Sequence, residues 1–209
     1  MACVFSWFPD ELGVLMDNYR WRTVDIVVTA VIAVAFGVIF WAWNLLWFTG
    51  VGAAVSWFPP LGAVVTGMWF VPAVLAPMIV RKPGAGFFAE LVAAQISFML
   101  GSAWGWTVLL YGAVQGIAGE IGFAAFRYRK WGAAQAMISG ALIGAAATVL
   151  DFTTTSYGEW SLNWKLVYAA LQIASGALIA GLGSAALTRG LSGTGVLDPF
   201  PSGRVRELV

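Results

Sequence analysis

The sequence contains no histidine and only one cysteine, Cys3, and each of these scarcities excludes a class of chemistry. Without histidine there is no imidazole general base, and zinc or haem sites with their usual ligands are not expected. A single cysteine cannot form a disulfide within the chain. The motifs G-x-x-x-x-G-K-[ST] and G-x-S-x-G are also missing, so we expect neither ATP binding through a P-loop nor the chemistry of a nucleophile elbow.

Charged residues are scarce as well, and this scarcity indicates the solvent for which the chain is built. Only 10% of the 209 residues are charged, 60% are hydrophobic, and the mean hydropathy is +0.84. Soluble domains carry about a quarter charged residues, whereas apolar runs of about 20 residues indicate transmembrane helices. The formal net charge of +1 gives no electrostatic basis for binding nucleic acid. We therefore expect an all-α integral protein of the cell membrane, surrounded by the lipid bilayer.

Six apolar runs account for most of the chain, and we interpret them as a multi-pass bundle of six transmembrane helices over residues 24–189. The second run contains Pro72 and Pro77, which remove backbone donors and predict a kink or break. A cytoplasmic segment, residues 1–23, precedes the bundle, and a cytoplasmic tail rich in Gly and Pro, residues 190–209, is expected to be flexible. The expected spans are 24–47, 61–80, 84–100, 104–126, 132–150 and 164–188.

The basic residues predict the orientation of these spans. Ten of the eleven lysines and arginines fall in segments that an even number of spans places on one side of the membrane, and only Lys165 falls on the other. Cytoplasmic segments are enriched in lysine and arginine, so we expect both termini in the cytoplasm. The third external loop, DFTTTSYGEWSLNW, is polar and aromatic; it suits either a cover over a pocket or an aromatic belt at the membrane interface.

Four polar residues interrupt the third and fourth apolar runs. Glu90 and Gln95 lie in FFAELVAAQISF, and Gln115 and Glu120 lie in LYGAVQGIAGEIGF. A carboxylate at mid-bilayer costs about 2.5–3.5 kcal/mol on insertion scales, so such a residue is by default a candidate functional site. Measured from the short turn between the two runs at about 1.5 Å per residue, Glu90 and Gln115 should lie at similar depth. The five-residue spacing within each pair keeps its two members from pointing in the same direction.

Tryptophan is frequent, with 12 residues, and together with the polar residues it indicates a ligand. A carboxylate accepts hydrogen bonds from amino groups, an amide both donates and accepts, and aromatic faces stack on flat rings or hold cations. These groups suit a flat, amino-bearing or cationic small molecule, whereas an anion fits poorly because no basic residue lies in the interior of a span. The candidate binding residues are Glu90, Gln95, Gln115, Glu120, Trp43, Trp47, Trp104 and Tyr111.

Structural roles are the alternative for the same residues. Glu120 is close enough to the cytoplasmic end of its span to pair with Arg127 or Arg129, and the glutamines can link helices by hydrogen bonds. Small residues four positions apart have two interpretations as well, because they favour close helix packing within the chain or docking of another membrane protein. The sequence leaves these alternatives open.

Three segments carry a resemblance to a known family: WRTVDIVVTAVIAVAFGVIFWAWN, RKPGAGFFAELVAAQ and YGAVQGIAGEIGF. Together they resemble the YkoE family, the substrate-binding (S) components of energy-coupling factor (ECF) transporters. The resemblance runs from Trp21 to about Arg189 and implies a six-helix S-component fold that captures thiamine or its hydroxymethylpyrimidine precursor from outside the cell. It implies two kinds of partner, a coupling membrane subunit and two ATPase subunits. It would place partner docking at Thr29, Ala33 and Gly37 on the first span.

Two other classes of function remain beside a vitamin-uptake subunit. One is an autonomous secondary transporter of a small organic cation that uses an intramembrane carboxylate, Glu90 or Glu120, for proton coupling. The other is an assembly protein without a ligand, in which the polar residues only link helices. None of the three is an enzyme, and none calls for a metal ion or another cofactor.

Overall fold

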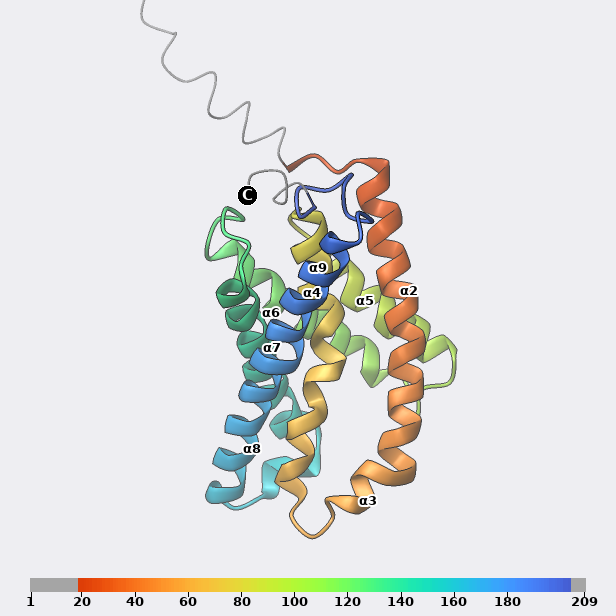
Figure 1. Ribbon diagram of the computed structural model, residues 1–209. Helices are drawn as coiled ribbons and strands as arrows, with labels where there is room; N and C mark the ends of the chain where they lie inside the picture. The colour runs from red at the N-terminus through yellow and green to blue at the C-terminus, as the bar shows by residue number, and fades with distance from the viewer. Residues whose placement is uncertain (1–18, 204–209) are drawn as a thin grey trace, which may run out of the picture.

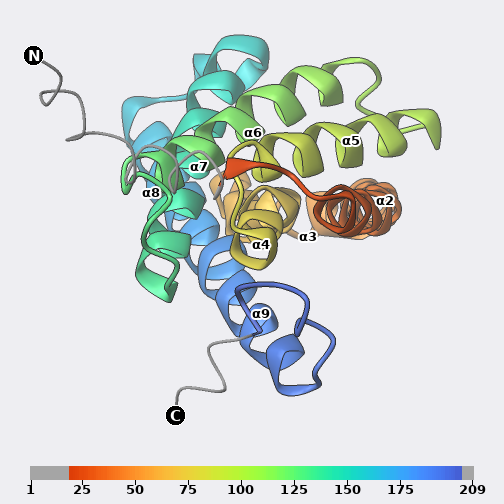
Figure 2. The ribbon, with the colours of Figure 1, turned by 90° about the horizontal axis from the view of Figure 1, so that it is seen from above.

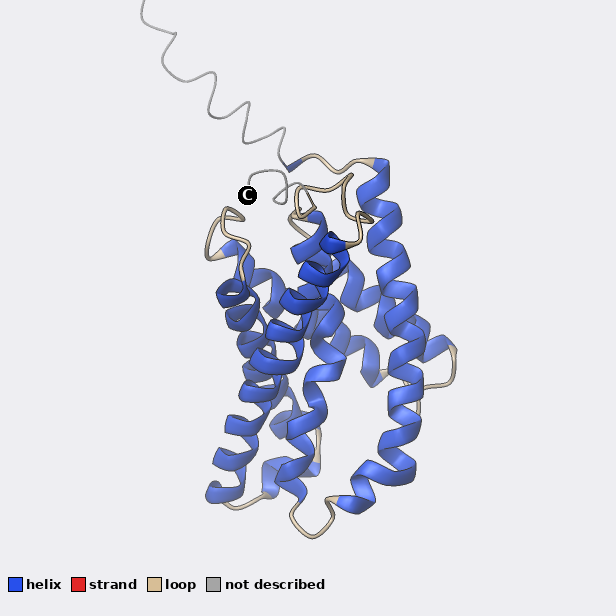
Figure 3. Cartoon of the chain, viewed as in Figure 1, coloured by secondary structure: helices blue, strands red, loops and turns tan. Residues whose placement is uncertain are grey.

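Helices form the framework of the chain in the computed structural model, which describes residues 19–203 and contains no strand within them (Figure 3). Cys3 and most of the predicted N-terminal segment lie outside the described residues. In chain order the elements are α2 (Thr23–Leu46), η1 (Trp47–Val51), α3 (Gly52–Ala54), η2 (Pro59–Phe70), α4 (Val71–Val80), α5 (Ala85–Met99), α6 (Thr107–Ala124), α7 (Ala133–Thr154), η3 (Ser156–Glu159), α8 (Leu162–Ser175), η4 (Gly176–Leu182) and α9 (Gly183–Gly193).

Five continuous helical stretches within the described residues are long and apolar enough to cross a membrane. They are Thr23–Ala54, Pro59–Val80, Thr107–Ala124, Ala133–Thr154 and Leu162–Gly193. The remaining predicted span corresponds to α5, which is apolar but has only 15 residues. At about 1.5 Å per residue α5 is about 22 Å long, shorter than the hydrocarbon core of about 30 Å. The result is an all-helical bundle with several membrane-spanning helices.

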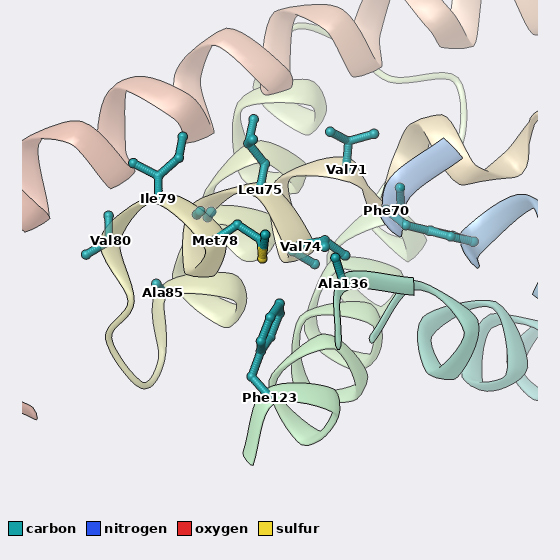
Figure 4. Packing of buried hydrophobic residues seen from close by; sticks show 14 of the residues in the cluster. Phe70, Val71, Val74, Leu75, Met78, Ile79, Val80, Ala85, Phe123 and Ala136 are labelled. Carbon is teal, nitrogen blue, oxygen red and sulfur yellow. The ribbon is translucent and has the colours of Figure 1, made fainter. Parts of the chain in front are cut away.

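Helix α4 occupies the centre of the bundle, because all ten of its residues are buried. Viewed from above, α2, α5, α6 and α7 follow one another around it, and α9 lies on the remaining side (Figure 2). Side chains from α5, α6 and α7 pack against α4 and the end of η2 (Figure 4). The labelled core residues there include Phe70, Val74, Leu75, Met78, Phe123 and Ala136. This central helix fixes the positions of the helices that carry polar side chains.

The second predicted span changes helix type where η2, a 3₁₀ helix, passes into α4. Pro72, one of the two prolines at which the sequence predicts a kink or break, lies in the first turn of α4, next to this change of helix type. The other, Pro77, lies inside α4. A 3₁₀ helix of 12 residues is long for this type and leaves backbone groups to be satisfied by neighbours. The Ser175 hydroxyl accepts a hydrogen bond from the Gly67 N–H at 2.9 Å and donates one to the Val64 carbonyl at 2.7 Å. Helix α8 thereby supports the irregular backbone of η2.

The segments that carry most of the basic residues gather at one end of the bundle. These segments are the start of α2, the turn between α4 and α5, the connection from α6 to α7, and the region after α9; both ends of the described chain lie with them (Figure 1). We call this the basic end. That the basic end faces the cytoplasm stays a prediction from the distribution of lysine and arginine.

The tail that the sequence predicts to be flexible packs against the basic end in its described part. Leu197 and Phe200 are buried there. The Ser202 hydroxyl donates a hydrogen bond to the Ile79 carbonyl at 2.9 Å. The Arg22 guanidinium donates to a tail carbonyl at 3.3 Å and lies 5.9 Å from the centre of the Phe200 ring. The prediction of a flexible tail rests on its content of Gly and Pro, whereas the burial of Leu197 and Phe200 holds the described part in place.

The stripe of small residues on α2 packs inside the chain. Thr29 and Ala33 are 0% exposed, and a Cβ atom at Gly37 would lie 2.5 Å from the Cβ of Ile96 on α5. Of the two interpretations of this stripe, internal packing is the one that the structure shows. The residues predicted to dock a partner are therefore not exposed, and α5 covers Gly37 among them.

Candidate substrate-binding site

A cavity of about 410 Å³ opens in the half of the bundle away from the basic end. It lies where α2 passes into η1, η2 begins and α7 ends, and α5, α6 and α8 complete its wall. Its aromatic lining residues are Phe40, Trp47, Trp69, Phe70, Trp104, Tyr111, Tyr157 and Tyr168. Its polar lining residues are Thr66, Glu90, Thr107, Gln115, Asp151, Thr154, Thr155 and Gln172. None of the described residues that line the cavity is basic.

Glu90 forms the first polar group of the cavity, and the start of α4 holds it in place. Its side chain is 0% exposed, and Oε2 accepts a hydrogen bond from the Ala73 N–H at 3.0 Å. Ala73 is in the first turn of α4, directly after the 3₁₀ helix η2. The other oxygen, Oε1, has no hydrogen-bond partner among the described residues. Glu90 therefore brings to the cavity wall a buried carboxyl group, one oxygen of which is unpaired.

Asp151 forms the second polar group, where α6, α7 and α8 meet. Its Oδ1 accepts a hydrogen bond from the Tyr111 hydroxyl at 2.6 Å. Its Oδ2 accepts from the Tyr168 hydroxyl at 2.8 Å and from the Gln172 amide at 2.9 Å. Thr154 lies 3.0 Å from the same Tyr111 hydroxyl. Three donors orient this carboxylate, but they are neutral, so its charge is left without a counter-ion in the cavity wall.

Aromatic rings form much of the cavity wall. The ring centres of Trp47 and Trp69 are 5.9 Å apart in an edge-to-face arrangement. Tyr157 packs edge-on against Tyr168 at 5.4 Å, and on its other side it stacks on Trp160 at 4.2 Å. Burial and the nearby Asp151 raise the pKa of Tyr157, so its hydroxyl remains neutral at physiological pH. These rings provide flat apolar faces at distances typical of aromatic packing.

Five of the eight candidate binding residues line this one cavity. They are Glu90, Gln115, Trp47, Trp104 and Tyr111. Glu90 and Gln115 come from the neighbouring helices α5 and α6, and both are buried. Tyr111 contributes in a way that the sequence does not reveal, because its hydroxyl binds Asp151.

The other three candidates lie elsewhere. Gln95 is exposed on the outer surface of α5, in agreement with the angle that separates it from Glu90. Glu120 accepts hydrogen bonds from the Gly86 N–H at 2.7 Å and the Tyr128 hydroxyl at 2.6 Å, and so joins α6 to the start of α5. Trp43 packs edge-on against Trp69, whose own ring forms the cavity wall.

Asp151, Tyr168 and Gln172 are cavity residues that the candidate set omits. The sequence does carry a signal for two of them, because Asp151 and Gln172 each interrupt an apolar run in the way that Glu90 does. The predicted fifth span ends at residue 150, whereas α7 continues to Thr154. Because the predicted span is four residues too short, the prediction places Asp151 in an external loop, whereas it lies on α7. Within the described residues, no group of three or more Cys, Asp or Glu side chains could hold a metal ion.

Comparison with known proteins places this architecture in a family. The model of the family described as "ABC-type cobalt transport system, permease component" matches residues 24–146. The "Putative HMP/thiamine permease protein YkoE" of Bacillus subtilis (strain 168) is 32% identical over 186 residues, which cover 88% of this chain and 91% of that protein. A crystal structure of an S-component of an ECF transporter matches with a TM-score of 0.84 and 29% sequence identity, covering 90% of this chain and 94% of that one.

These similarities extend over most of the chain and apply to the helical bundle as a whole. They confirm the predicted fold class and the predicted place in the membrane. They also show a substrate-binding transport subunit, which works with the other parts of an ECF transporter, and not an enzyme. The chain belongs to the YkoE family of S components of ECF transporters.

Proposed function

We propose that the chain captures thiamine or its hydroxymethylpyrimidine precursor (HMP) from outside the cell, and that it does so in the cavity between Glu90 and Asp151. The observation that carries the proposal is the unpaired Oε1 of Glu90, a buried carboxyl oxygen in the cavity wall. A buried polar atom without a partner is costly, and a ligand donor that reaches it removes this cost. The name of the Bacillus subtilis relative supports the same class of substrate.

The aminopyrimidine ring, which thiamine and HMP share, matches the inner part of the cavity. Its exocyclic amino group donates hydrogen bonds, and the adjacent ring nitrogen accepts them. The free oxygen of Glu90 accepts from the amino group, and the Gln115 amide, 6% exposed on the neighbouring helix, offers both a donor and an acceptor. In this proposal, the two side chains recognise the polar edge of the pyrimidine.

The thiazolium ring of thiamine matches the outer part of the cavity. Its positive charge is favoured near Asp151, whose hydrogen-bond donors Tyr111, Tyr168 and Gln172 are all neutral. The faces of Trp47, Trp69 and Trp104 supply flat surfaces for the rings and for cation–π attraction. In this proposal, the neutral pyrimidine ring binds at Glu90 and the cationic thiazolium ring binds at Asp151.

Transport then needs partners that supply energy. The sequence has no P-loop, so in this proposal two ATPase subunits hydrolyse ATP and a coupling membrane subunit transmits the change to the bundle. Membership of the ECF transporter S components supports this division of work. Co-purification of the chain with products of neighbouring transporter genes would identify these subunits.

Binding of a panel of related compounds tests the proposal. We expect saturable quenching of tryptophan fluorescence by thiamine and by HMP, and binding at least about a hundredfold weaker for thiamine pyrophosphate. Phosphate groups in this cavity would face two acidic side chains and no basic one, which costs several kcal/mol at short range. Isothermal titration calorimetry of the purified chain in lipid nanodiscs measures the three affinities. If neither thiamine nor HMP binds, or if the pyrophosphate binds more tightly, the proposal is wrong.

Replacing Asp151 by asparagine should separate the two substrates. A pair of charges about 6 Å apart at an effective dielectric constant of about 20 is worth about 3 kcal/mol, so thiamine affinity should fall about tenfold to a hundredfold. HMP carries no positive charge, and its affinity should fall less than about threefold. Calorimetry with both ligands on the same preparation of Asp151→Asn makes the comparison. Equal losses for both ligands would place the cation away from Asp151.

A further inference from the structure

Asn44 stands out among the buried polar residues because it does not line the cavity but contacts two residues that do. It lies near the end of α2 and is 2% exposed. Its Oδ1 accepts hydrogen bonds from the indole N–H of Trp69 at 2.9 Å and of Trp104 at 3.2 Å. Its Nδ2 donates to the hydroxyls of Ser97 at 3.3 Å and Ser102 at 3.0 Å. These four bonds use the whole donor and acceptor capacity of the amide.

The chemistry of indole determines which way this amide points. An indole N–H can only donate, so both tryptophans require the oxygen of Asn44 and not its nitrogen. The nitrogen must then face the two serines, whose hydroxyls can accept. A leucine of similar volume would leave both indole N–H groups without their acceptor. The hydrogen bonds that orient the two tryptophan rings would then be lost.

The two tryptophans come from different parts of the chain, and Asn44 joins them. Trp69 belongs to η2, whereas Trp104 lies in the turn between α5 and α6. The same turn is fixed a second time through Ser102, which accepts hydrogen bonds from Asn44 and from the Trp104 N–H. Both indoles line the cavity, so a single amide contacts two separate elements of its aromatic wall.

We propose that Asn44 is a positioning residue for ligand binding, which holds the indoles of Trp69 and Trp104 in the rotation that receives the flat ring of the ligand. For the identity of that ligand, the inference rests on the proposed function. The positioning itself is independent of it, because the four hydrogen bonds exist in the chain without ligand. Asn44 thus contributes to affinity without touching the substrate.

Substitution of Asn44 by leucine, aspartate and serine tests the proposal with neutral HMP as ligand, so that an added charge has little direct effect. Asn44→Leu should lower HMP affinity about tenfold or more, since two hydrogen bonds that orient the wall are lost. Asn44→Asp keeps an acceptor for both indoles, and the serine hydroxyls can turn to donate, so its affinity should stay within about threefold of the wild type. If Asn44→Leu does not fold, Asn44→Ser, which admits water to the polar cluster, should show the same loss.

A spectroscopic measurement separates positioning from general stability. In ¹H–¹⁵N spectra of the chain labelled at the tryptophan indoles, without ligand, the signals of Trp69 and Trp104 should shift in Asn44→Leu and stay near their original places in Asn44→Asp. Ser97→Ala is the matched control, because it removes one partner of Asn44 and leaves both indole bonds; its HMP affinity should be unchanged even where its unfolding temperature falls.

Two results would overturn the proposal. One is an Asn44→Leu variant with unshifted indole signals, and the other is an equal loss of affinity in Asn44→Leu and Asn44→Asp. If the wild type bound neither HMP nor thiamine, the proposed function would fail, whereas the indole signals would still test the positioning by Asn44.

Discussion

Replacing Glu90 by glutamine is expected to lower thiamine affinity about a hundredfold while the bundle stays folded. Glutamine keeps an oxygen that can accept the hydrogen bond from the Ala73 N–H, so the contact with the start of α4 is preserved. The free oxygen becomes an NH₂ group, which would face the amino group of the pyrimidine as donor against donor. Losing a hydrogen bond to a charged group and leaving a buried donor unpaired together cost about 3 kcal/mol, or about a hundredfold in affinity.

Glu120→Gln provides the matched control for this prediction. It is the same substitution on the neighbouring helix, but Glu120 binds the Gly86 N–H and the Tyr128 hydroxyl and does not line the cavity. We expect a lower unfolding temperature and unchanged thiamine affinity. Calorimetry gives the affinities, and differential scanning fluorimetry gives the unfolding temperatures. The prediction fails if Glu90→Gln binds thiamine as the wild type does, or if both variants lose affinity equally.

Adjacent helices explain which part of the site can be predicted from the sequence. Glu90 and Gln115 lie on helices joined by a short turn, so counting the helical rise from that turn predicts a common depth, and both residues line the cavity. The helical angle likewise separates Gln95, now on the outer surface, from Glu90 in the cavity. Such arguments need only local geometry, and they work because a membrane helix is regular over this length.

The cluster around Asp151 marks where this reasoning ends. Its partners come from α6, α7 and α8, and the contact between Tyr111 and Asp151 joins residues 40 positions apart. The order in which helices pack around α4 decides this contact, and apolar patterns do not encode that order when every helix face is apolar. The turn before α6 is similar, since the meeting of Trp104 with Asn44 depends on how the end of α2 packs beside it.

Small residues illustrate the same limit in a different way. Gly140 and Gly144 on α7 have the four-residue spacing typical of close helix contacts, and the structure gives them a partner, the non-α segment η4 and the end of α8. The stripe on α2 has the same kind of spacing but packs on α5. Spacing therefore predicts that a close approach occurs, whereas the identity of the approaching helix follows from the whole bundle.

Replacing Gly140 by leucine is expected to have the largest effect on stability, because it separates α7 from η4. A Cβ atom at Gly140 would meet the carbonyl oxygen of Gly176, and one at Gly176 would meet the carbonyl of Gly140. Both obstacles are backbone atoms within helices, so neither can move aside alone. Forcing extra volume into a packed contact costs about 1–3 kcal/mol or more, and a leucine here should prevent recovery of folded protein. Gly140→Ala should lower the unfolding temperature by several degrees.

Gly190→Ala is the control for these variants, since Gly190 also lies in a helix but a Cβ atom there meets nothing within 4 Å. Alanine favours helix more than glycine does, so Gly190→Ala should leave the unfolding temperature unchanged or raise it. Scanning fluorimetry in the same detergent compares the variants. A Gly140→Ala protein as stable as Gly190→Ala would show that α7 and η4 do not approach as closely as described.

The contact of α7 with η4 and the end of α8 also affects ligand binding, through Gly144. A Cβ atom at Gly144 would lie 2.6 Å from the carbonyl oxygen of Gln172, the residue whose amide binds Asp151 at 2.9 Å. Gly144→Ala must push α8 away from α7 and so stretch the hydrogen bonds that Gln172 and Tyr168 donate to Asp151. Thiamine affinity should therefore fall in Gly144→Ala more than in Gly140→Ala. Both glycines lie at the contact of α7 with η4 and the end of α8, but Gly140 is one helical turn further from Asp151.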